Sequence, residues 1–388
     1  MLTFFNFKTF FRVFRKSFSS EESDVIPLTP KRIIFLVCFF TIYSAIQIFN
    51  AICFKLDELL YDEYRNVKPK QPVFIIGNPR SGTTYIHRLL ALDKDRFFCF
   101  KTWEIIFPSI IQKKILTLLG RIDHLMGHPI YKVIQKKEKA SLSRFNQMHP
   151  TGLFYPEECS LLFIHIFSSH NLLFLFPIKG EFDGFLYFDQ SLPISEKCRI
   201  MSFYIECIKR QAFYLNHKGD LLSKSPTFSP KIKSLYEYFP ECKIIYMVRS
   251  PMEVVPSVLS FAEGLSRSTT DFTLNQEMYD NIYQMVKTFY EYPLSYLFEQ
   301  DPTRYAIVRY EELLSKPSDV ITSIYNRFGF DLKADHLRLL EEVDDQARKY
   351  SSHHRYSLEQ FNLSEKAIQH DFKKVFDRFD FLKAEIQS

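Results

Sequence analysis

Residues 72–92 read PVFIIGNPRSGTTYIHRLLAL and carry the strongest structural signal in the chain. The apolar run at 72–76 leads into a loop with two glycines, Gly77 and Gly82, and a helical pattern follows over Thr83–Leu92. Glycine is scarce, with 10 among 388 residues, so two in one short loop are informative. A strand, a glycine loop and a helix N-terminus together direct backbone N–H groups toward an anion. The stretch therefore predicts an anion-binding loop in an α/β domain.

The loop has the glycine spacing of nucleotide-binding P-loops, but Thr83 stands where the P-loop lysine would be. That lysine normally contacts the β- and γ-phosphates of a nucleoside triphosphate, so its absence argues against an ordinary kinase or ATPase. Arg80 offers a guanidinium group to an anion instead, and Ser81, Thr83 and Thr84 add hydroxyls. A plain turn is the alternative, but a turn does not need an arginine and several hydroxyl residues between a strand and a helix.

Short apolar runs alternate with helical patterns along the rest of the chain. We expect strands at 96–100, 221–223, 243–248 and 305–309, and helices at 104–137, 230–238, from 251, at 274–299 and at 317–328. Buried strands separated by helices predict a parallel sheet that is covered on both faces. The predicted fold is α/β, a P-loop-like three-layer α/β/α domain with a central parallel sheet at residues 67–388.

A second candidate motif, RSPMEVVPS, begins at the end of the predicted strand 243–248. Arg249 follows this strand directly, and Ser257 lies about two turns into the next helix. Ligands of open α/β sheets bind at the carboxyl ends of the strands, so the two side chains could hold a phosphate. A surface ion pair is the alternative for Arg249.

Together these motifs resemble the PAPS-dependent sulfotransferases, in particular the Golgi-like and bacterial branch. The resemblance implies that the loop binds the 5′-phosphosulfate of 3′-phosphoadenosine 5′-phosphosulfate (PAPS), and that Arg249 and Ser257 bind its 3′-phosphate. The loop residues concerned are Pro79, Arg80, Ser81, Gly82, Thr83 and Thr84. Further family-like stretches are LSKSP at 222–226, FPECK at 239–243 and VRYEEL at 308–313. The K-x-G-x-x-G-D loop of the cytosolic branch is absent, and SSHHRYSL stands there instead.

Sulfonate transfer in line needs positioning, charge stabilisation and a general base. By resemblance, Lys224 is the cation near the leaving phosphate. Three candidates remain for the base: Glu104, where Golgi-type relatives carry a catalytic glutamate; the pair Glu157 and Glu158, which resembles an acidic motif of some bacterial members; and His149. We expect no metal, since the patterns HExxH and DxDxDG are absent.

The sequence thus predicts a transferase that moves a sulfonate from PAPS to a hydroxyl or amine and releases PAP. No sequence pattern identifies the acceptor, so a carbohydrate, a lipid and a tyrosine all remain candidates. A P-loop nucleotide kinase and a catalytically inactive scaffold are the alternatives. Nucleic acid is not expected as a partner, because 50 basic and 45 acidic residues nearly balance. Seven cysteines without a CxxC pair do not indicate a zinc ribbon.

Residues 1–66 are predicted to form a membrane-associated segment. Phenylalanines recur every three or four residues beside basic ones, as an amphipathic helix would require. The stripe comprises Phe4, Phe7, Phe11, Phe14 and Phe18, and the flanking cations are Lys8, Arg12, Arg15 and Lys16. A helix that packs on the body of the protein itself is the alternative.

Residues 33–54, after a polar linker, carry no charge. A helix of that length reaches about 33 Å, enough to cross a bilayer as a signal-anchor. Residues 1–32 carry six Lys or Arg and three Asp or Glu, which predicts a cytoplasmic N-terminus. A buried or interfacial helix is the alternative, in which case the catalytic domain would stay in the cytoplasm.

Overall fold

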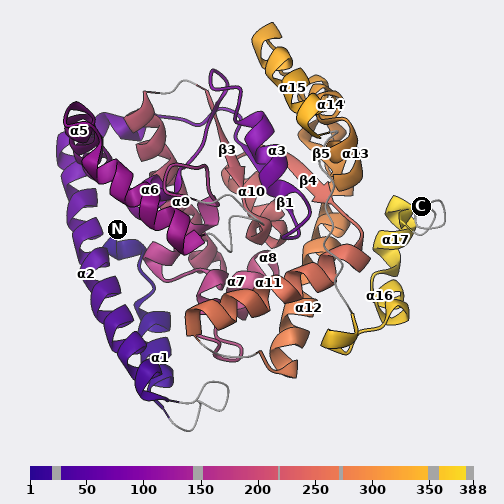
Figure 1. Cartoon of the computed structure of the whole chain (residues 1–388), viewed down its shortest axis with the longest axis horizontal. Coiled ribbons are helices and arrows are strands. Elements are labelled where there is room, and N and C mark those ends of the chain that lie inside the picture. Colours follow the sequence, from indigo (N-terminus) through magenta and orange to yellow (C-terminus); the bar gives the residue numbers. More distant parts are fainter. Residues whose placement is uncertain (20–27, 143–151, 217–218, 271–273, 348–357, 382–388) are drawn as a thin grey trace.

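The computed structural model describes residues 1–19, 28–142, 152–216, 219–270, 274–347 and 358–381 (Figure 1). Five strands form a parallel sheet in the order β2-β3-β1-β4-β5. The strands are β1 (Val73–Gly77), β2 (Phe97–Phe98), β3 (Asp220–Lys224), β4 (Lys243–Val248) and β5 (Tyr305–Arg309). The predicted parallel sheet is confirmed, although β2 is shorter than expected.

Helices make up most of the remaining described chain. They are α1 (Phe7–Ser17), α2 (Pro30–Leu60), α3 (Thr83–Leu90), α4 (Thr102–Ile106), α5 (Ile110–Leu125), α6 (Pro129–Leu142), α7 (Asp183–Leu186), α8 (Phe188–Ser191), α9 (Ile194–Leu215), α10 (Ile232–Tyr238), α11 (Pro251–Thr270), α12 (Gln276–Tyr296), α13 (Tyr310–Ser315), α14 (Pro317–Phe328), α15 (Ala334–Ala347), α16 (Glu365–Asp371) and α17 (Lys373–Phe379). Short 3-10 helices include η3 (Cys159–Ile166), η4 (His170–Phe174) and η5 (Pro226–Lys231).

The mostly helical stretch expected at 104–137 forms the three helices α4, α5 and α6. Ser109 adopts an extended backbone and caps the N-terminus of α5 in a capping box with Gln112. Gly127 and His128 have positive φ values of 83° and 64°, which end α5 and separate it from α6. The breaks arise from capping chemistry that the apolar pattern alone does not show.

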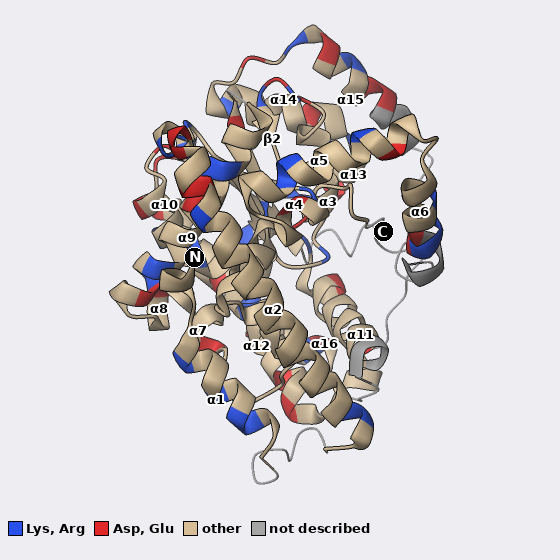
Figure 2. Ribbon diagram, turned by 90° about the vertical axis from the view of Figure 1, so that its left-hand side faces the viewer, with Lys and Arg blue, Asp and Glu red and all other residues tan. Residues whose placement is uncertain are grey.

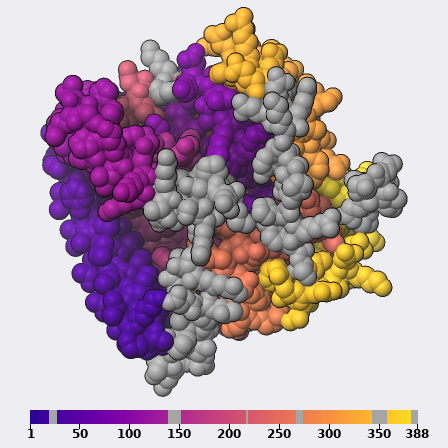
Figure 3. Space-filling model, in the orientation of Figure 1, coloured from indigo at the N-terminus to yellow at the C-terminus, as the bar shows by residue number. Residues whose placement is uncertain are grey.

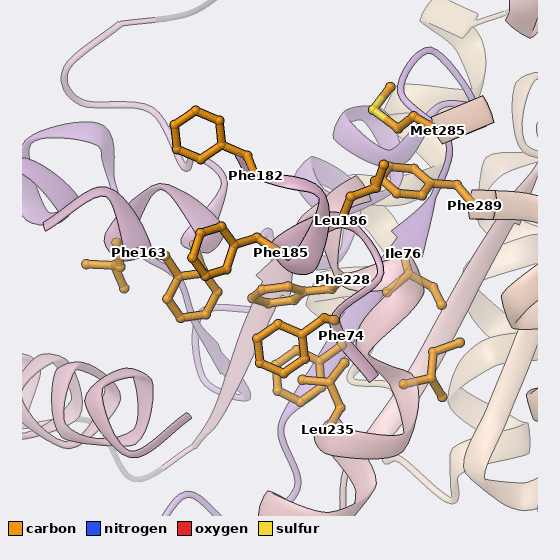
Figure 4. Close-up of a cluster of buried hydrophobic side chains, with 14 of the residues drawn as sticks. Phe74, Ile76, Phe163, Phe182, Phe185, Leu186, Phe228, Leu235, Met285 and Phe289 are labelled. Atoms are coloured by element: carbon orange, nitrogen blue, oxygen red, sulfur yellow. The ribbon is translucent and has the colours of Figure 1, made fainter. Parts of the chain in front are cut away.

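Side chains of β1 alternate between two apolar layers, as expected for a sheet covered on both faces. Val73 and Ile75 pack in one layer with α3 and α14, where Leu89 and Ile324 are buried. Phe74 points into the opposite layer, with η5, α9 and α12 (Figure 4). The three-layer arrangement confirms the predicted fold class.

The second layer is rich in aromatic rings (Figure 4). Phe228 of η5 lies 5.9 Å from Phe74 of β1 and 5.9 Å from Phe163 of η3, between ring centroids. Phe167 and Phe176, from the phenylalanine-rich segment that precedes α7, are also buried there. These rings therefore form core, and they fix the segment that carries η3 and η4 against the sheet.

Helices α1 and α2 lie along one side of the domain (Figures 1 and 3). Val13 of α1 and Leu36, Phe40 and Phe54 of α2 belong to the same hydrophobic core as the second layer. The N-terminal helices therefore pack on the α/β domain. The boundary between residues 66 and 67 stays a prediction.

The two faces of α1 differ in their contacts. Phe10, which lies outside the predicted stripe, contacts Tyr43 and Phe167. Three members of the stripe, Phe7, Phe11 and Phe14, are exposed. Helix α2 is long and apolar enough to cross a membrane by length and composition alone, which is weak evidence for a span.

Candidate active site

The loop that follows β1 needs both of its glycines. Gly77 has a φ of 135°, and a Cβ atom there would lie 2.4 Å from the carbonyl oxygen of Met247. Gly82 has a φ of 87°, and a Cβ atom would lie 2.7 Å from the ring of Tyr310. Helix α3 begins at Thr83, so its first-turn amides lie at the end of this loop. The backbone thus has the strand, loop and helix arrangement that binds anions.

Arg80 connects the loop to the second motif. Its Nε donates to Ser257 Oγ at 3.2 Å, and its carbonyl oxygen accepts from Arg249 Nη1 at 3.0 Å. The Arg249 guanidinium lies over the Tyr310 ring at 4.2 Å and pairs with Glu253 at 2.7 Å. Two motifs that are far apart in sequence therefore form one cluster of cations and hydroxyls at the carboxyl ends of β1 and β4.

The other loop residues divide into internal and accessible groups. Ser81 is buried, and its Oγ donates to the carbonyl oxygen of Asn78 at 2.6 Å. Thr83 is also buried, whereas Pro79, Arg80, Gly82 and Thr84 are half-buried. The internal hydrogen bond of Ser81 holds the turn in shape.

Asn78 is a site residue that the sequence interpretation missed. Its Nδ2 donates to the carbonyl oxygen of Val286 at 3.3 Å, which joins the loop to α12. Its buried Oδ1 has no hydrogen-bond partner among the described residues. The signal available in the sequence was its position, directly after the strand and between the glycine and the proline.

Lys224 ends strand β3 beside the loop strand, where it pairs in register with Ile75. Its side chain is buried, and its Nζ donates to Glu158 Oε1 at 2.9 Å. Glu157 Oε1 lies 3.7 Å from the same nitrogen. A buried ammonium group between two carboxylates is held in one position, because an unpaired buried charge is costly.

The two glutamates reach Lys224 because their segment runs antiparallel to the chain after β2. Lys101 and Pro156 form a β-bridge, and the Glu157 amide donates to the carbonyl oxygen of Phe100 at 2.9 Å. Glu157 and Glu158 are both half-buried. Sequence spacing could not show this pairing, because it joins an insertion to the edge of the sheet.

Glu104 lies elsewhere, in the first turn of α4. Its carboxylate accepts from the Lys101 amide at 2.7 Å and from Gln211 Nε2 at 2.9 Å. It is buried, and the hydrogen bonds of its carboxylate to the described residues go to Lys101 and Gln211 and not to Lys224 or the loop. His149, the third predicted base, lies outside the described residues.

His87, on α3 beneath the loop, is a weak candidate for the general base by sequence alone. It is buried, and its ring lies against the backbone of Leu222 in β3. Burial lowers the pKa of His87 to about 3, and the charge of Lys224 acts in the same direction. The ring is therefore neutral at physiological pH and acts as a spacer between α3 and β3.

Residues 72–334 match the sequence model of the sulfotransferase family. Two curated relatives are the omega-hydroxy-beta-dihydromenaquinone-9 sulfotransferases Stf3 of Mycobacterium bovis and Mycobacterium tuberculosis. Each is 26% identical over 319 residues, which covers 80% of this chain and 75% of the relative.

Two solved structures share the fold. Sulfotransferase STF9 from Mycobacterium avium has a TM-score of 0.72 at 18% identity, covering 95% of this chain and 91% of that chain. Sulfotransferase STF1 from Mycobacterium tuberculosis has a TM-score of 0.66 at 17% identity, covering 95% and 93%. The fold, the site and the family match over most of the chain agree, and the chain belongs to the sulfotransferase family, whose members transfer sulfonate groups.

Proposed function

We propose that this protein transfers a sulfonate from PAPS to a hydroxyl group of a membrane lipid. The observation that carries the proposal is the position of Arg80, which hydrogen-bonds both Arg249 and Ser257 while it belongs to the anion loop. One nucleotide with phosphates at two positions matches such a joined pair of anion sites, whereas a nucleoside triphosphate needs only the loop.

The residues present fit PAPS. The first-turn amides of α3 and the hydroxyl of Thr84 would hold the 5′-phosphosulfate, because a helix N-terminus favours negative charge. Arg249 and Ser257 would hold the 3′-phosphate through charge-assisted hydrogen bonds. Both motifs are half-buried or buried in the crevice at the carboxyl ends of the strands, where α/β folds bind nucleotides.

Lys224 and its two carboxylates would carry the chemistry. One of Glu157 and Glu158 accepts the proton of the acceptor hydroxyl, and the hydroxyl oxygen forms a bond to sulfur while the bond from sulfur to the 5′-phosphate oxygen breaks. Lys224 stabilises the negative charge that gathers on the departing phosphate. The contact of 2.9 Å with Glu158 keeps this ammonium in place before the reaction.

Our proposal gives Glu104 a structural role. Its carboxylate already accepts two hydrogen bonds in a buried site, from Lys101 and Gln211, so it caps α4. A base must be within reach of the proton that it removes, and the pair beside Lys224 meets this requirement better.

A lipid acceptor is supported by two observations. The curated relatives are named for an omega-hydroxylated dihydromenaquinone, which is a lipid with a hydroxyl group. A largely apolar cavity of about 150 Å³ is lined by Phe174, Ile178, Ala262 and Met285, among others. Met285 precedes Val286, whose carbonyl oxygen accepts from Asn78 Nδ2, so α12 both lines the cavity and supports the anion-binding loop.

The test is transfer of radioactive sulfonate by the full-length chain. PAPS labelled with ³⁵S is incubated with an omega-hydroxylated menaquinol in detergent, with a monosaccharide and with a tyrosine peptide. We expect label in the lipid alone, and none with Lys224→Met. Label in the sugar or peptide alone would contradict the lipid acceptor. Phosphate transfer from [γ-³²P]ATP instead would support a kinase, and binding without any transfer would support an inactive scaffold.

A further inference from the structure

We infer that α1 and α2 dock the enzyme on an anionic membrane surface, with α2 lying in the plane of the membrane. The inference rests on the two faces of α2, on the contacts along its whole length and on the cations of α1. It stands apart from the identity of the sulfonate acceptor, since the tests below measure membrane binding and not transfer.

Helix α2 turns three polar side chains inward among apolar core residues, whereas its exposed face is apolar. Its buried residues include Gln47, Asn50 and Asp57. The exposed large side chains of residues 33–54 are all hydrophobic, namely Ile33, Ile34, Val37, Ile42, Ile46, Ile48, Phe49 and Ile52. A surface helix in water exposes polar residues instead, and an apolar patch of this extent marks an interaction surface.

The buried side chains of Gln47, Asn50 and Asp57 are hydrogen-bonded to other parts of the domain. Asn50 Oδ1 accepts from Gln112 Nε2 at 2.7 Å, and His165 lies 3.2 Å from both Asn50 and Gln47. Asp57 accepts from the Ser109 hydroxyl and from the backbone amide of Ile110. These contacts fix which face is turned outward.

The same contacts argue against a perpendicular span. Near the start of α2, Arg32 Nη2 donates to the carbonyl oxygen of Leu175 at 2.8 Å. In the middle, Tyr43 donates to Ile164 at 2.6 Å, and near the end Asp57 pairs with Arg210 at 3.1 Å. The domain therefore accompanies α2 over its apolar length. A span would carry the attached domain into the hydrocarbon, where exposed polar groups are excluded.

The charges beside this face complement an anionic lipid surface. The central part of α2 shows no charged residue, whereas α1 carries basic residues beside it (Figure 2). Lys8 and Arg15 are exposed on α1, next to the exposed rings of Phe7, Phe11 and Phe14. Basic residues flanking an apolar face are the pattern of helices that lie in the membrane interface.

The first test is flotation of the full chain with vesicles of phosphatidylcholine and phosphatidylglycerol at 3:1. We expect binding that falls at least 10-fold in the triple variant Ile42→Glu, Ile46→Glu and Phe49→Glu. The matched control replaces exposed leucines on the distant helix α15, Leu337→Glu with Leu339→Glu, and should float like the wild type.

The same flotation assay also tests the role of the cations on α1. Lys8→Glu with Arg15→Glu should weaken binding to the anionic vesicles, by roughly 5-fold for each charge removed, and should leave the binding to pure phosphatidylcholine unchanged. Unchanged flotation of the triple variant would overturn the inference. A wild type that ignores vesicles and forms a dimer, which the triple variant dissociates, would assign the face to a second copy.

The depth of labels on α2 in the bilayer distinguishes a helix in the plane of the membrane from one that spans it. This measurement introduces no charged residue into α2. Single cysteines replace Ile34, Ile42 and Ile52 in a background in which exposed Cys38 and Cys198 are serine, and each is labelled with a fluorophore. Quenching by brominated lipids should give one shallow depth for all three labels. A deep label at residue 42 between two shallow ones would show a span and overturn the inference.

Discussion

The anion-binding loop after β1 and helix α2 differ in where their polar side chains point. Arg80 of the loop meets Arg249 and Ser257 of a distant segment at the crevice where α/β folds bind ligands. In α2, Asn50 and Asp57 turn inward to protein partners, and the outer face is apolar. A polar cluster at a strand end indicates an exchangeable polar ligand, whereas a helix with its polar groups satisfied inside indicates an apolar environment outside.

Lys224 offers the largest effect on the donor side of this comparison. Lys224→Met should lower kcat by about 10² to 10³, because a preorganised donor to the departing phosphate is lost. The control is Lys233→Met, an exposed lysine that pairs only loosely with Glu237 at 3.9 Å. Steady-state sulfonate transfer measures both. A Lys224→Met enzyme with a normal kcat would remove Lys224 from the mechanism.

Substitutions of the three glutamates distinguish a catalytic role from a structural one. Glu157→Gln or Glu158→Gln should lower kcat by about 10², and by more if that residue is the base. Glu104→Gln should instead lower Tm and keep kcat, since its carboxylate caps α4. Transfer rates and thermal unfolding of the three variants decide. A Glu104→Gln protein with normal Tm and no activity would restore Glu104 as the base.

On the α2 side, Asp57→Ala tests whether the helix is part of the fold. The change leaves Arg210, which is 1% exposed, without one of its carboxylates, and it removes the acceptor for three groups at the start of α5. We expect the free energy of unfolding to fall by about 3 kcal/mol. Asp62→Ala, at an exposed position, is the control for urea unfolding. Equal stability of the two variants would mean that α2 is only an attached segment.

Ser257→Ala sharpens the account of the donor site. Losing one hydrogen bond to a charged phosphate should weaken the binding of PAP by about 10-fold and leave that of ADP unchanged. Ser260→Ala, on the same helix and half-buried, is the matched control. Calorimetric titration measures all of these affinities. An equal loss for PAP and ADP would place Ser257 away from the 3′-phosphate.

Each region contains a buried neutral histidine, which predicts a pH dependence of stability. Burial lowers the pKa of His87, beneath the loop, and of His165, beneath α2, below the ordinary value. The unfolded chain takes up these protons at a higher pH than the native state does, so stability falls as the pH drops below about 6.5. For His87 the loss is roughly 2 kcal/mol at pH 5. Denaturant unfolding at pH 7 and 5 should show a smaller loss in His87→Asn, and an unchanged loss would contradict this.

Local signals made the fold and the loop predictable. Residues 72–92 contain a strand, its loop and its helix in one continuous stretch, and Arg249 with Ser257 lies within a single turn and helix. The contact between Lys224 and Glu158 was not predictable, because an antiparallel segment beside β2 creates it. The orientation of α2 was also hidden, since the apolar run of residues 33–54 has the same composition whether it spans, lies on the surface or packs inside.

The most direct test of the central claim is calorimetric titration of the full-length protein with PAP, ADP and Mg-ATP. Our account predicts that PAP binds at least 10-fold more tightly than ADP, because Arg80 joins the anion loop to a second site for the 3′-phosphate. Equal affinity for PAP and ADP, or binding of Mg-ATP alone, would contradict it.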